Sequence, residues 1–327
     1  MKQYPTKPKD HSETVLRDKT DTIAVLAADL HFSLKPPIAR SCHEDWLEVQ
    51  WGYARQLRLL SLQAPVLVAG DIFDKWNTPA ELVNMLLKEL PQIYAVPGQH
   101  DLAHHSYEDI RRTSYWTLVE AGKIIHTGPE TRARDIFGWH PIRVWGYPWG
   151  TEPEPLKGLN DLVCEIAVIH TYVWSDKSGA YPNAPKENHV NNLAKKLKGH
   201  DVVVSGDNHQ AQDYKFKSGM LWFNAGGFQR RKMDERQHKP SVGLLKVDAK
   251  TGERRIERHY LDVSQDRFID EGSNASAESW SGMEDLLQEL SDLGDSTINF
   301  EEALKRAIGG KEVPIMVREA ILRSLTQ

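Results

Sequence analysis

Five apolar stretches of this sequence each run into a side chain that could bind a metal ion. The stretch 65–69, for example, stops at Gly70-Asp71. The residues that share this position are Asp29, His31, Asp71, Gln99, His170, Asp207 and His209. Carboxylate, imidazole and amide groups are ligands of divalent ions. One such residue after a strand is more often a cap or a turn former, but five stretches in succession predict a metal site.

Asp71 is the residue around which the others can be arranged, because a pair of ions needs one shared carboxylate and donors from several strands. Two ions about 3.5–4 Å apart can activate water as hydroxide and polarise phosphoryl oxygens, which suits attack on phosphorus. His100, beside Gln99, is the candidate general acid for the leaving oxygen, and Asp101 could orient its ring. A purely electrostatic effect on phosphate is the alternative for His100, and Asp74 is expected to fix its loop.

The elements that must position these residues follow from the pattern of apolar positions. The stretches 22–28, 65–69 and 92–96 are predicted to be buried parallel strands, joined by helices over 43–62, from Pro79 onward, and over 106–121. The carboxyl ends of parallel strands meet at one edge of a sheet, where ligands gather. The candidate ligands are therefore expected to lie close together.

Beyond Gly122 the pattern favours strands. They are predicted at 124–125, 136–139, 144–147 and 165–169, and then at 202–205, 220–224, 241–247 and 254–262, where the last four close a second sheet. A short helix is expected around 191–197. The fold class is therefore α/β: a four-layer α/β/β/α sandwich with a small helical C-terminal appendage. Its domains are a flexible tail at 1–20, a catalytic domain at 21–265, and a linker with short helices at 266–327.

Composition excludes several classes of protein. The 327 residues carry a formal net charge of −5, which argues against a surface coated in basic residues but permits a local basic patch. No apolar run approaches the ~20 residues needed to span a bilayer. The two cysteines, Cys42 and Cys164, have no metal-binding spacing and fit a reducing compartment. We expect a soluble, cytoplasmic protein without a membrane partner.

The order of these motifs resembles the signature of calcineurin-like metallophosphoesterases. Asp-x-His, Gly-Asp-x-x-Asp, Gly-Gln-His-Asp, a single His and Gly-Asp-x-His follow one another over about residues 21–263. The resemblance implies the sandwich fold and phosphomonoester or phosphodiester hydrolysis with two divalent metals, for which Mn²⁺ is expected and Mg²⁺, Fe and Zn²⁺ are alternatives. It implies Asp29, His31, Asp71 and His209 for metal one. It implies Asp71, Gln99, His170 and Asp207 for metal two.

Two of these residues depart from the family pattern, and both fall on metal two. Gln99 stands where the family has Asn, and Asp207 stands where it has His. Both changes keep or add oxygen donors, which favour hard ions such as Mn²⁺ or Mg²⁺. They also leave open that metal two binds weakly.

Two further segments resemble SbcD-type DNA-repair nucleases within this superfamily. They are Gly70-Asp71-Ile72-Phe73-Asp74, followed by Pro79, and Asn224-Ala225-Gly226-Gly227-Phe228-Gln229-Arg230. The resemblance implies a DNA nuclease, an exonuclease or an endonuclease, working in DNA repair, recombination or phage-like DNA processing. One alternative is a phosphatase or small phosphodiesterase on nucleotides or phosphoproteins. Another is a metal-binding scaffold without turnover, for DNA or for a protein partner.

Candidate contacts with DNA lie on a loop with five Lys or Arg and two acids, from Arg230 to Lys239. Arg230 and Arg231 are its candidate substrate residues, and an exposed polar hairpin explains the loop equally well. Three tryptophans, Trp139, Trp145 and Trp149, could stack on bases, although packing in the core and sheet is the favoured interpretation. His104 and His105 could touch substrate, although a solvated loop is favoured. The resemblance implies an SbcC-like ATPase as a candidate partner of the C-terminal helices. A homodimer is a further candidate.

Overall fold

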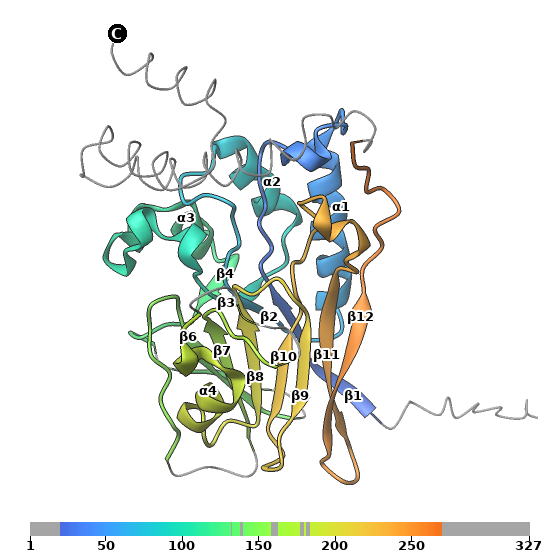
Figure 1. Cartoon of the computed structure of the whole chain (residues 1–327). Coiled ribbons are helices and arrows are strands. Elements are labelled where there is room, and N and C mark those ends of the chain that lie inside the picture. Colours follow the sequence, from blue (N-terminus) through green and yellow to red (C-terminus); the bar gives the residue numbers. More distant parts are fainter. Residues whose placement is uncertain are drawn as a thin grey trace, which may run out of the picture.

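The chain folds into two mixed β-sheets that pack face to face, with helices on their outer sides (Figure 1). The computed structural model describes residues 20–131, 133–137, 140–157, 163–176, 180 and 184–269, with residues 20 and 21 by their backbone alone. The predicted α/β fold, two sheets flanked by helices, is confirmed. The tail before residue 20, the linker at 271–279 and the helices expected at 283–293, 300–308 and 313–325 lie outside the described residues.

The first sheet has six strands in the order β12-β11-β1-β2-β3-β4. Four of them form its parallel half: β1 (Thr20–Ala28), β2 (Val66–Ala69), β3 (Ile93–Val96) and β4 (Ile124–His126). Because these strands are parallel, the loops that follow β1, β2 and β3 emerge at one edge. The predicted positions of these strands are therefore confirmed.

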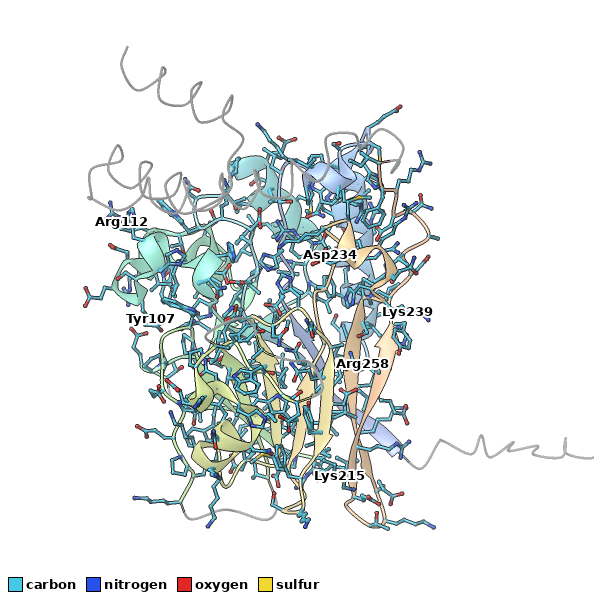
Figure 2. All side chains as sticks on the ribbon, in the orientation of Figure 1. Tyr107, Arg112, Lys215, Asp234, Lys239 and Arg258 are labelled. Carbon is cyan, nitrogen blue, oxygen red and sulfur yellow. The ribbon has the colours of Figure 1, made fainter. Side chains whose placement is uncertain are left out.

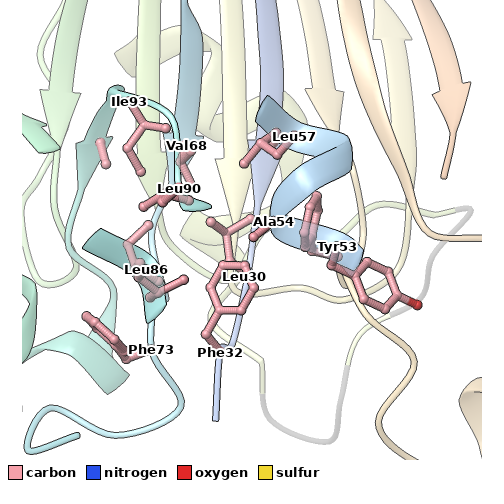
Figure 3. Close-up of a cluster of buried hydrophobic side chains, with 14 of the residues drawn as sticks. Leu30, Phe32, Tyr53, Ala54, Leu57, Val68, Phe73, Leu86, Leu90 and Ile93 are labelled. Atoms are coloured by element: carbon pink, nitrogen blue, oxygen red, sulfur yellow. The ribbon is translucent and has the colours of Figure 1, made fainter. Parts of the chain in front are cut away.

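Three helices cover the outer face of this sheet: α1 (Trp46–Ser61), α2 (Ala80–Glu89) and α3 (Ser114–Glu120). Helix α1 begins where the Asp45 side chain accepts a hydrogen bond from the amide of Glu48, which caps the helix. Its buried Ala54 and Leu57 face Val68 of β2 in the apolar cluster drawn in Figure 3. Burial of this face holds the helix against the strands that carry the site.

The second sheet has the order β5-β6-β7-β8-β10-β9. Its strands are β5 (Ala133–Ile136), β6 (Ile142–Tyr147), β7 (Cys164–His170), β8 (Val202–Gly206), β9 (Gln212–Lys215) and β10 (Leu221–Asn224). Helix α4 (Val190–Lys196) packs on its outer face through Val190 and Leu193. Strand β9 is a finding that the sequence pattern does not predict, because its residues are mostly polar.

Successive side chains of a strand point to opposite faces of its sheet, and this alternation divides the core into layers. In β7, Ile166 and Val168 face the first sheet, whereas Ala167 and Ile169 face the side covered by α4. Leu26 of β1 meets the same central layer from the opposite sheet. Side chains that alternate between two buried faces require cover on both sides, and the outer helices supply it.

One prediction of sheet membership is wrong. The strands expected at 241–247 and 254–262 do not join the second sheet, because β11 (Ser241–Asp248) pairs antiparallel with β1. Strand β12 (Arg254–Tyr260) then pairs with β11 at the edge of the first sheet. A strand's apolar pattern gives its faces but not its neighbour.

The single helix predicted over 106–121 is also wrong in its continuity. The segment Tyr107–Arg112 is a 3₁₀ helix, and α3 begins only after Thr113. The Thr113 hydroxyl accepts a hydrogen bond from the amide of Trp116, and the amide of Ser114 donates to the carbonyl of Trp76. These contacts stop one helix and start the next.

The last described residues, 266–269, belong to the sandwich by their contacts. Residues 266–269, assigned to the linker by the sequence, still contact the sandwich: Asp266 pairs with Arg40 and Arg230, and the amide of Ile269 donates to the carbonyl of Ala39.

Within the described ranges, none of the helices combines the length and apolarity that a bilayer crossing requires.

Candidate metal centre

Four of the predicted ligands stand in backbone conformations that side chains seldom adopt. The φ angles of Asp29, His31, Asp71 and Asp207 are 52°, 46°, 50° and 78°. A non-glycine residue in this left-handed region costs free energy, and such residues cluster at functional sites. The strain is maintained because hydrogen bonds fix the loops: the amide of His31 donates to the carbonyl of Asp71 at 2.9 Å.

Asp71 lies between two histidines, as the sequence predicts for a shared carboxylate. Its Oδ2 is 3.5 Å from Nε2 of His31 and 3.4 Å from Nε2 of His170. Its Oδ1 accepts a hydrogen bond of 3.0 Å from the amide of His100. One carboxylate oxygen therefore faces both sides of the site while the other is held by the backbone.

Each of the three predicted histidine ligands has an oxygen atom within 3.6 Å of Nδ1 and turns Nε2 inward. Nδ1 of His170 lies 2.8 Å from the carbonyl of Ala69. Nδ1 of His31 lies 3.5 Å from Asp74 Oδ1, and Nδ1 of His209 lies 3.6 Å from Glu235 Oε1. Metal-binding histidines commonly have a carboxylate or a carbonyl at the ring nitrogen that does not bind the ion.

Asp29 supplies the observation that tests whether a cation fits here. Its side chain is buried, and its Oδ2 has no hydrogen-bond partner. A buried carboxylate oxygen without a donor is costly unless a cation satisfies it. Oδ1 of Asp29 accepts from the amide of Asp207 at 2.9 Å, so the orphaned oxygen stays turned toward the site.

Three groups of side chains have donor atoms within 4.8 Å of one another. Among the described residues they are Asp29, His31 and His209; His31, Asp71 and His100; and Asp29, Asp71 and His170. Nε2 of His31 and Nε2 of His209 are 3.1 Å apart. The residues present therefore fit the divalent ions that the fold family uses, and Asp29, His31 and Asp71 each belong to two groups.

Gln99 and Asp207, the two residues that depart from the family pattern, also lie in the site. Oε1 of Gln99 is 2.7 Å from Nε2 of His170, and Nε2 of Gln99 donates to Asp207 Oδ1 at 3.0 Å. The structure thus brings all seven predicted ligands together. It leaves Gln99 bonded to two of its neighbours.

Electrostatics divides the buried groups. Burial raises the pKa of Asp29 to about 6, although His209 and His170 act against it. Burial would also raise the pKa of Asp71, but His170, His100 and His31 lower it well below the ordinary range. Burial, aided by Arg231, lowers the pKa of His31 to about 3. A neutral His31 beside a charged Asp71 is the protonation state that metal ligation requires.

The role suggested for Asp101 needs correction. The Asp101 carboxylate does not contact the ring of His100, whose Nδ1 lies 3.0 Å from the carbonyl of Asp74. It accepts instead from the amides of Ile72, Phe73 and Gly98 at 3.0–3.1 Å. Three converging amides outcompete a single imidazole for a buried carboxylate. Asp101 is therefore a positioning residue that ties the Asp71 loop to the Gln99 loop.

Gly98 is needed for the same approach of loops. A Cβ at this position would lie 2.0 Å from Asp71 Oδ1 and 2.6 Å from the Asp71 amide nitrogen. Backbone atoms cannot move aside cheaply in a close-packed interior. The glycine therefore allows the β3 loop to reach the shared carboxylate.

The two candidate substrate arginines have different surroundings. Nε of Arg230 donates to Asp266 at 2.8 Å and its Nη1 donates to the carbonyl of Arg236, so its guanidinium is part of the fold. Arg231 instead forms an ion pair with Asp74 at the edge of the metal centre, and its side chain is 20% exposed. Sequence reasoning missed Glu235, which faces His209, because no local pattern distinguishes it from other acids of a polar loop.

Buried carboxylates and histidines at the joined edges of two sheets define a class: hydrolases that act on phosphoesters with divalent ions. Residues 24–211, more than half of the chain, match the family model described as calcineurin-like phosphoesterase. The chain belongs to this family. A comparison with curated proteins gave no significant match.

Solved structures with a similar fold include enzymes with different substrates in their names. The 5'-nucleotidase precursor from Thermus thermophilus is 14% identical, with a TM-score of 0.45, over 83% of this chain and 60% of that chain. The 5'-nucleotidase from Candida albicans is 14% identical, with a TM-score of 0.44, over 74% and 52%. The phosphopantetheinyl hydrolase from Mycobacterium tuberculosis is 15% identical, with a TM-score of 0.42, over 72% and 96%. The chain thus spans about half to three fifths of the two nucleotidases.

Proposed function

We propose that this phosphoesterase is a DNA nuclease, a metal-dependent phosphodiesterase of DNA repair, recombination or phage-like DNA processing. The observation that carries the proposal is the meeting, at the metal centre, of the two segments that resemble SbcD-type nucleases. The amide of Phe228 donates to the carbonyl of Asp29 at 3.2 Å, and Gln229 Nε2 donates to the carbonyl of Leu30 at 2.7 Å. Arg231, the first residue after the segment 224–230, pairs with Asp74 of the segment 70–74.

Two divalent ions would be held by the seven predicted ligands, with Asp71 shared between them. When bound, they would activate water and polarise the phosphoryl oxygens of the substrate. We propose Mn²⁺, because the oxygen donors of Gln99 and Asp207 favour hard ions on one side of the site. On the other side, the imidazoles of His31 and His209 suit Fe and Zn²⁺ as well, which are the alternatives to Mn²⁺.

His100 is the candidate proton donor for the leaving oxygen. Its amide bonds Asp71 and its Nδ1–H donates to the carbonyl of Asp74, so both its backbone and its ring plane are fixed. This hydrogen bond leaves Nε2 as the nitrogen that can exchange a proton with substrate. The ring of His31 lies at 5.0 Å, centroid to centroid, which places His100 beside the ligands.

Arg231 is the candidate phosphate contact. It is held in place by Asp74, which also faces Nδ1 of His31, so the guanidinium stays next to the ligands. Two other residues of its loop, Asp234 and Lys239, are exposed and are labelled in Figure 2. A protein of net charge −5 would need such a local cation to hold a DNA strand.

Digestion of end-labelled DNA tests the proposal. Purified full-length protein with Mn²⁺ is incubated with single-stranded and double-stranded DNA and, in parallel, with nucleoside monophosphates and bis-p-nitrophenyl phosphate. We expect shortened DNA products that require metal and are absent with Asp71→Asn. Asp45→Asn is the matched control, because the same change at the cap of α1 keeps an oxygen acceptor for Glu48 and touches none of the ligands.

Intact DNA together with hydrolysis of the small esters would contradict the nuclease proposal and favour a phosphatase or small phosphodiesterase. Elemental analysis completes the test. One ion or none per chain, with no turnover of either substrate, would favour a non-catalytic scaffold.

A further inference from the structure

Four aromatic side chains form two ring pairs on loops that also carry residues of the metal centre. The ring of His104 lies 5.8 Å from that of Trp76, and the ring of the next residue, His105, lies 5.7 Å from that of Trp149. Both pairs are tilted, at 46° and 49°. Both histidines are exposed and both tryptophans are partly exposed. We call these four residues the aromatic rim.

The two histidines are held in a conformation that the chain does not adopt by default. The φ angles are 52° for His104 and 53° for His105, consecutive left-handed residues that are neither glycine nor asparagine. Each costs free energy and persists only where its surroundings fix it. Two backbone hydrogen bonds fix this turn, from the amide of His105 to the carbonyl of Leu102 at 3.2 Å and from the amide of Ser106 to the carbonyl of Ala103 at 2.9 Å. The turn holds both histidine rings in exposed positions.

The rim is joined to the metal centre by short covalent and hydrogen-bonded links. Trp76 lies two residues beyond Asp74, and His104 lies four residues beyond His100. The amide of Trp149 donates to the carbonyl of Pro97, just before Gly98 and the ligand Gln99, at 3.2 Å. All the rim positions are thereby fixed relative to the ligands. The 3₁₀ segment that follows the rim begins at Tyr107 and ends at Arg112, both labelled in Figure 2.

We propose that the aromatic rim binds unpaired nucleobases of a single-stranded end by stacking, next to the phosphodiester held at the metal centre. This inference rests on the proposed nuclease function and names its substrate class. Flat aromatic rings on a surface bind bases through their π-faces and tolerate every base. A base within a duplex already stacks on its neighbours and hides its faces, so the rim selects frayed or single-stranded DNA.

Binding of two 12-nucleotide probes to the full-length protein in EDTA tests the rim without turnover. One probe is fluorescein-labelled oligo-dT, and the other has the same phosphates with abasic residues. Fluorescence anisotropy should show tighter binding of oligo-dT. Trp76→Ala or His104→Ala should reduce that preference about fivefold or more, because a stacked base contributes about 1–3 kcal/mol.

Two substitutions serve as controls for these variants. Trp76→Phe keeps a flat ring and should retain most of the preference. Trp51→Ala removes a tryptophan of α1 whose ring contacts Arg55 and Lys88, and should retain all of it. His105→Ala tests the second pair without removing Trp149, which packs partly against the core.

Equal binding of both probes by the unaltered protein, or an unchanged preference in the alanine variants, would contradict base stacking by the aromatic rim. This result is distinguishable from failure of the nuclease proposal. DNA hydrolysis in Mn²⁺ without any preference for bases would contradict the role of the aromatic rim alone. A preference for bases that depends on the aromatic rim, with no hydrolysis of DNA, would contradict the nuclease proposal alone.

Discussion

The metal centre has two halves, which correspond to the predicted ligands of metal one and of metal two. The donor atoms of these two halves are satisfied in different ways. In the first half, Asp29 has an orphaned oxygen, and Nε2 of His31 and His209 face each other at 3.1 Å. In the second half, Gln99 bonds both His170 and Asp207. A cation entering the first half satisfies the orphaned oxygen of Asp29 and displaces one hydrogen bond, between His31 and His209, whereas a cation entering the second half must displace both hydrogen bonds of Gln99. The difference predicts that two ions at this centre would bind with unequal affinity.

The shared residue should show the largest effect. Asp71→Asn removes the charge that faces both halves, and we expect activity with Mn²⁺ to fall on the order of a thousandfold or more, because metal chemistry contributes several kcal/mol. Elemental analysis should show loss of both ions, while thermal unfolding shows that the chain still folds. A variant that keeps half of its rate would contradict the shared role.

Matched substitutions in the two halves test the inequality directly. Asp29→Asn should reduce activity about a hundredfold, because it removes a charged ligand whose second oxygen has no other partner. Asp207→Asn should cost about tenfold, because Gln99 and His170 remain. Metal titration by calorimetry should show the tighter binding step weakened by the first change and the weaker step by the second. Equal losses in both variants would break the comparison.

Restoring the family's residues should make the halves more alike. Gln99→Asn combined with Asp207→His replaces one anionic oxygen by an imidazole nitrogen in the second half. We expect the preference of that half to move from Mn²⁺ toward Zn²⁺ by several-fold, because nitrogen donors favour the softer ion. Competition dialysis followed by elemental analysis measures the ratio. An unchanged ratio would show that these two residues do not set metal choice.

The stability of the fold in acid is expected to depend on His126, a buried histidine that is not one of the predicted metal ligands. His126 is buried between Tyr107 and Tyr115, whose hydroxyls lie 2.7 Å and 3.0 Å from its two ring nitrogens, and Arg134 lies nearby. Burial, aided by Arg134, lowers the pKa of His126 to about 4 from 6.5. The unfolded chain then binds the proton more readily than the folded one, so stability should fall as the pH drops from about 6.5 to 4.

Urea unfolding at several pH values, with and without Mn²⁺, measures this contribution. The metal-free protein should lose stability over that range, and His126→Gln should flatten the loss. The loss in free energy of unfolding is the smallest effect predicted for the chain. If the variant shows the same dependence on pH, another group carries the acid sensitivity.

Much of the site could be predicted from the sequence because it depends on local order. An apolar strand that ends in Asp or His places that side chain at the carboxyl edge, and parallel strands bring their edges together. For this reason Asp29, Asp71 and His170 could be expected to lie close together, and their donor atoms do lie within 4.8 Å of one another. The left-handed conformations of the same loops were not predictable, because they depend on hydrogen bonds between the loops that follow β1 and β2.

The sequence by itself determined which residues follow the strands and which faces of those strands are apolar. Only the tertiary structure decided that β11 pairs with β1, that Asp101 binds three amides, that Glu235 faces His209, and that two histidines lie tilted against separate tryptophans. Each of these contacts joins residues whose sequence separation leaves no periodic trace. Strand pairing and hydrogen-bond partners are selected by the global packing of the chain, whereas alternation along a strand is a property of the strand itself.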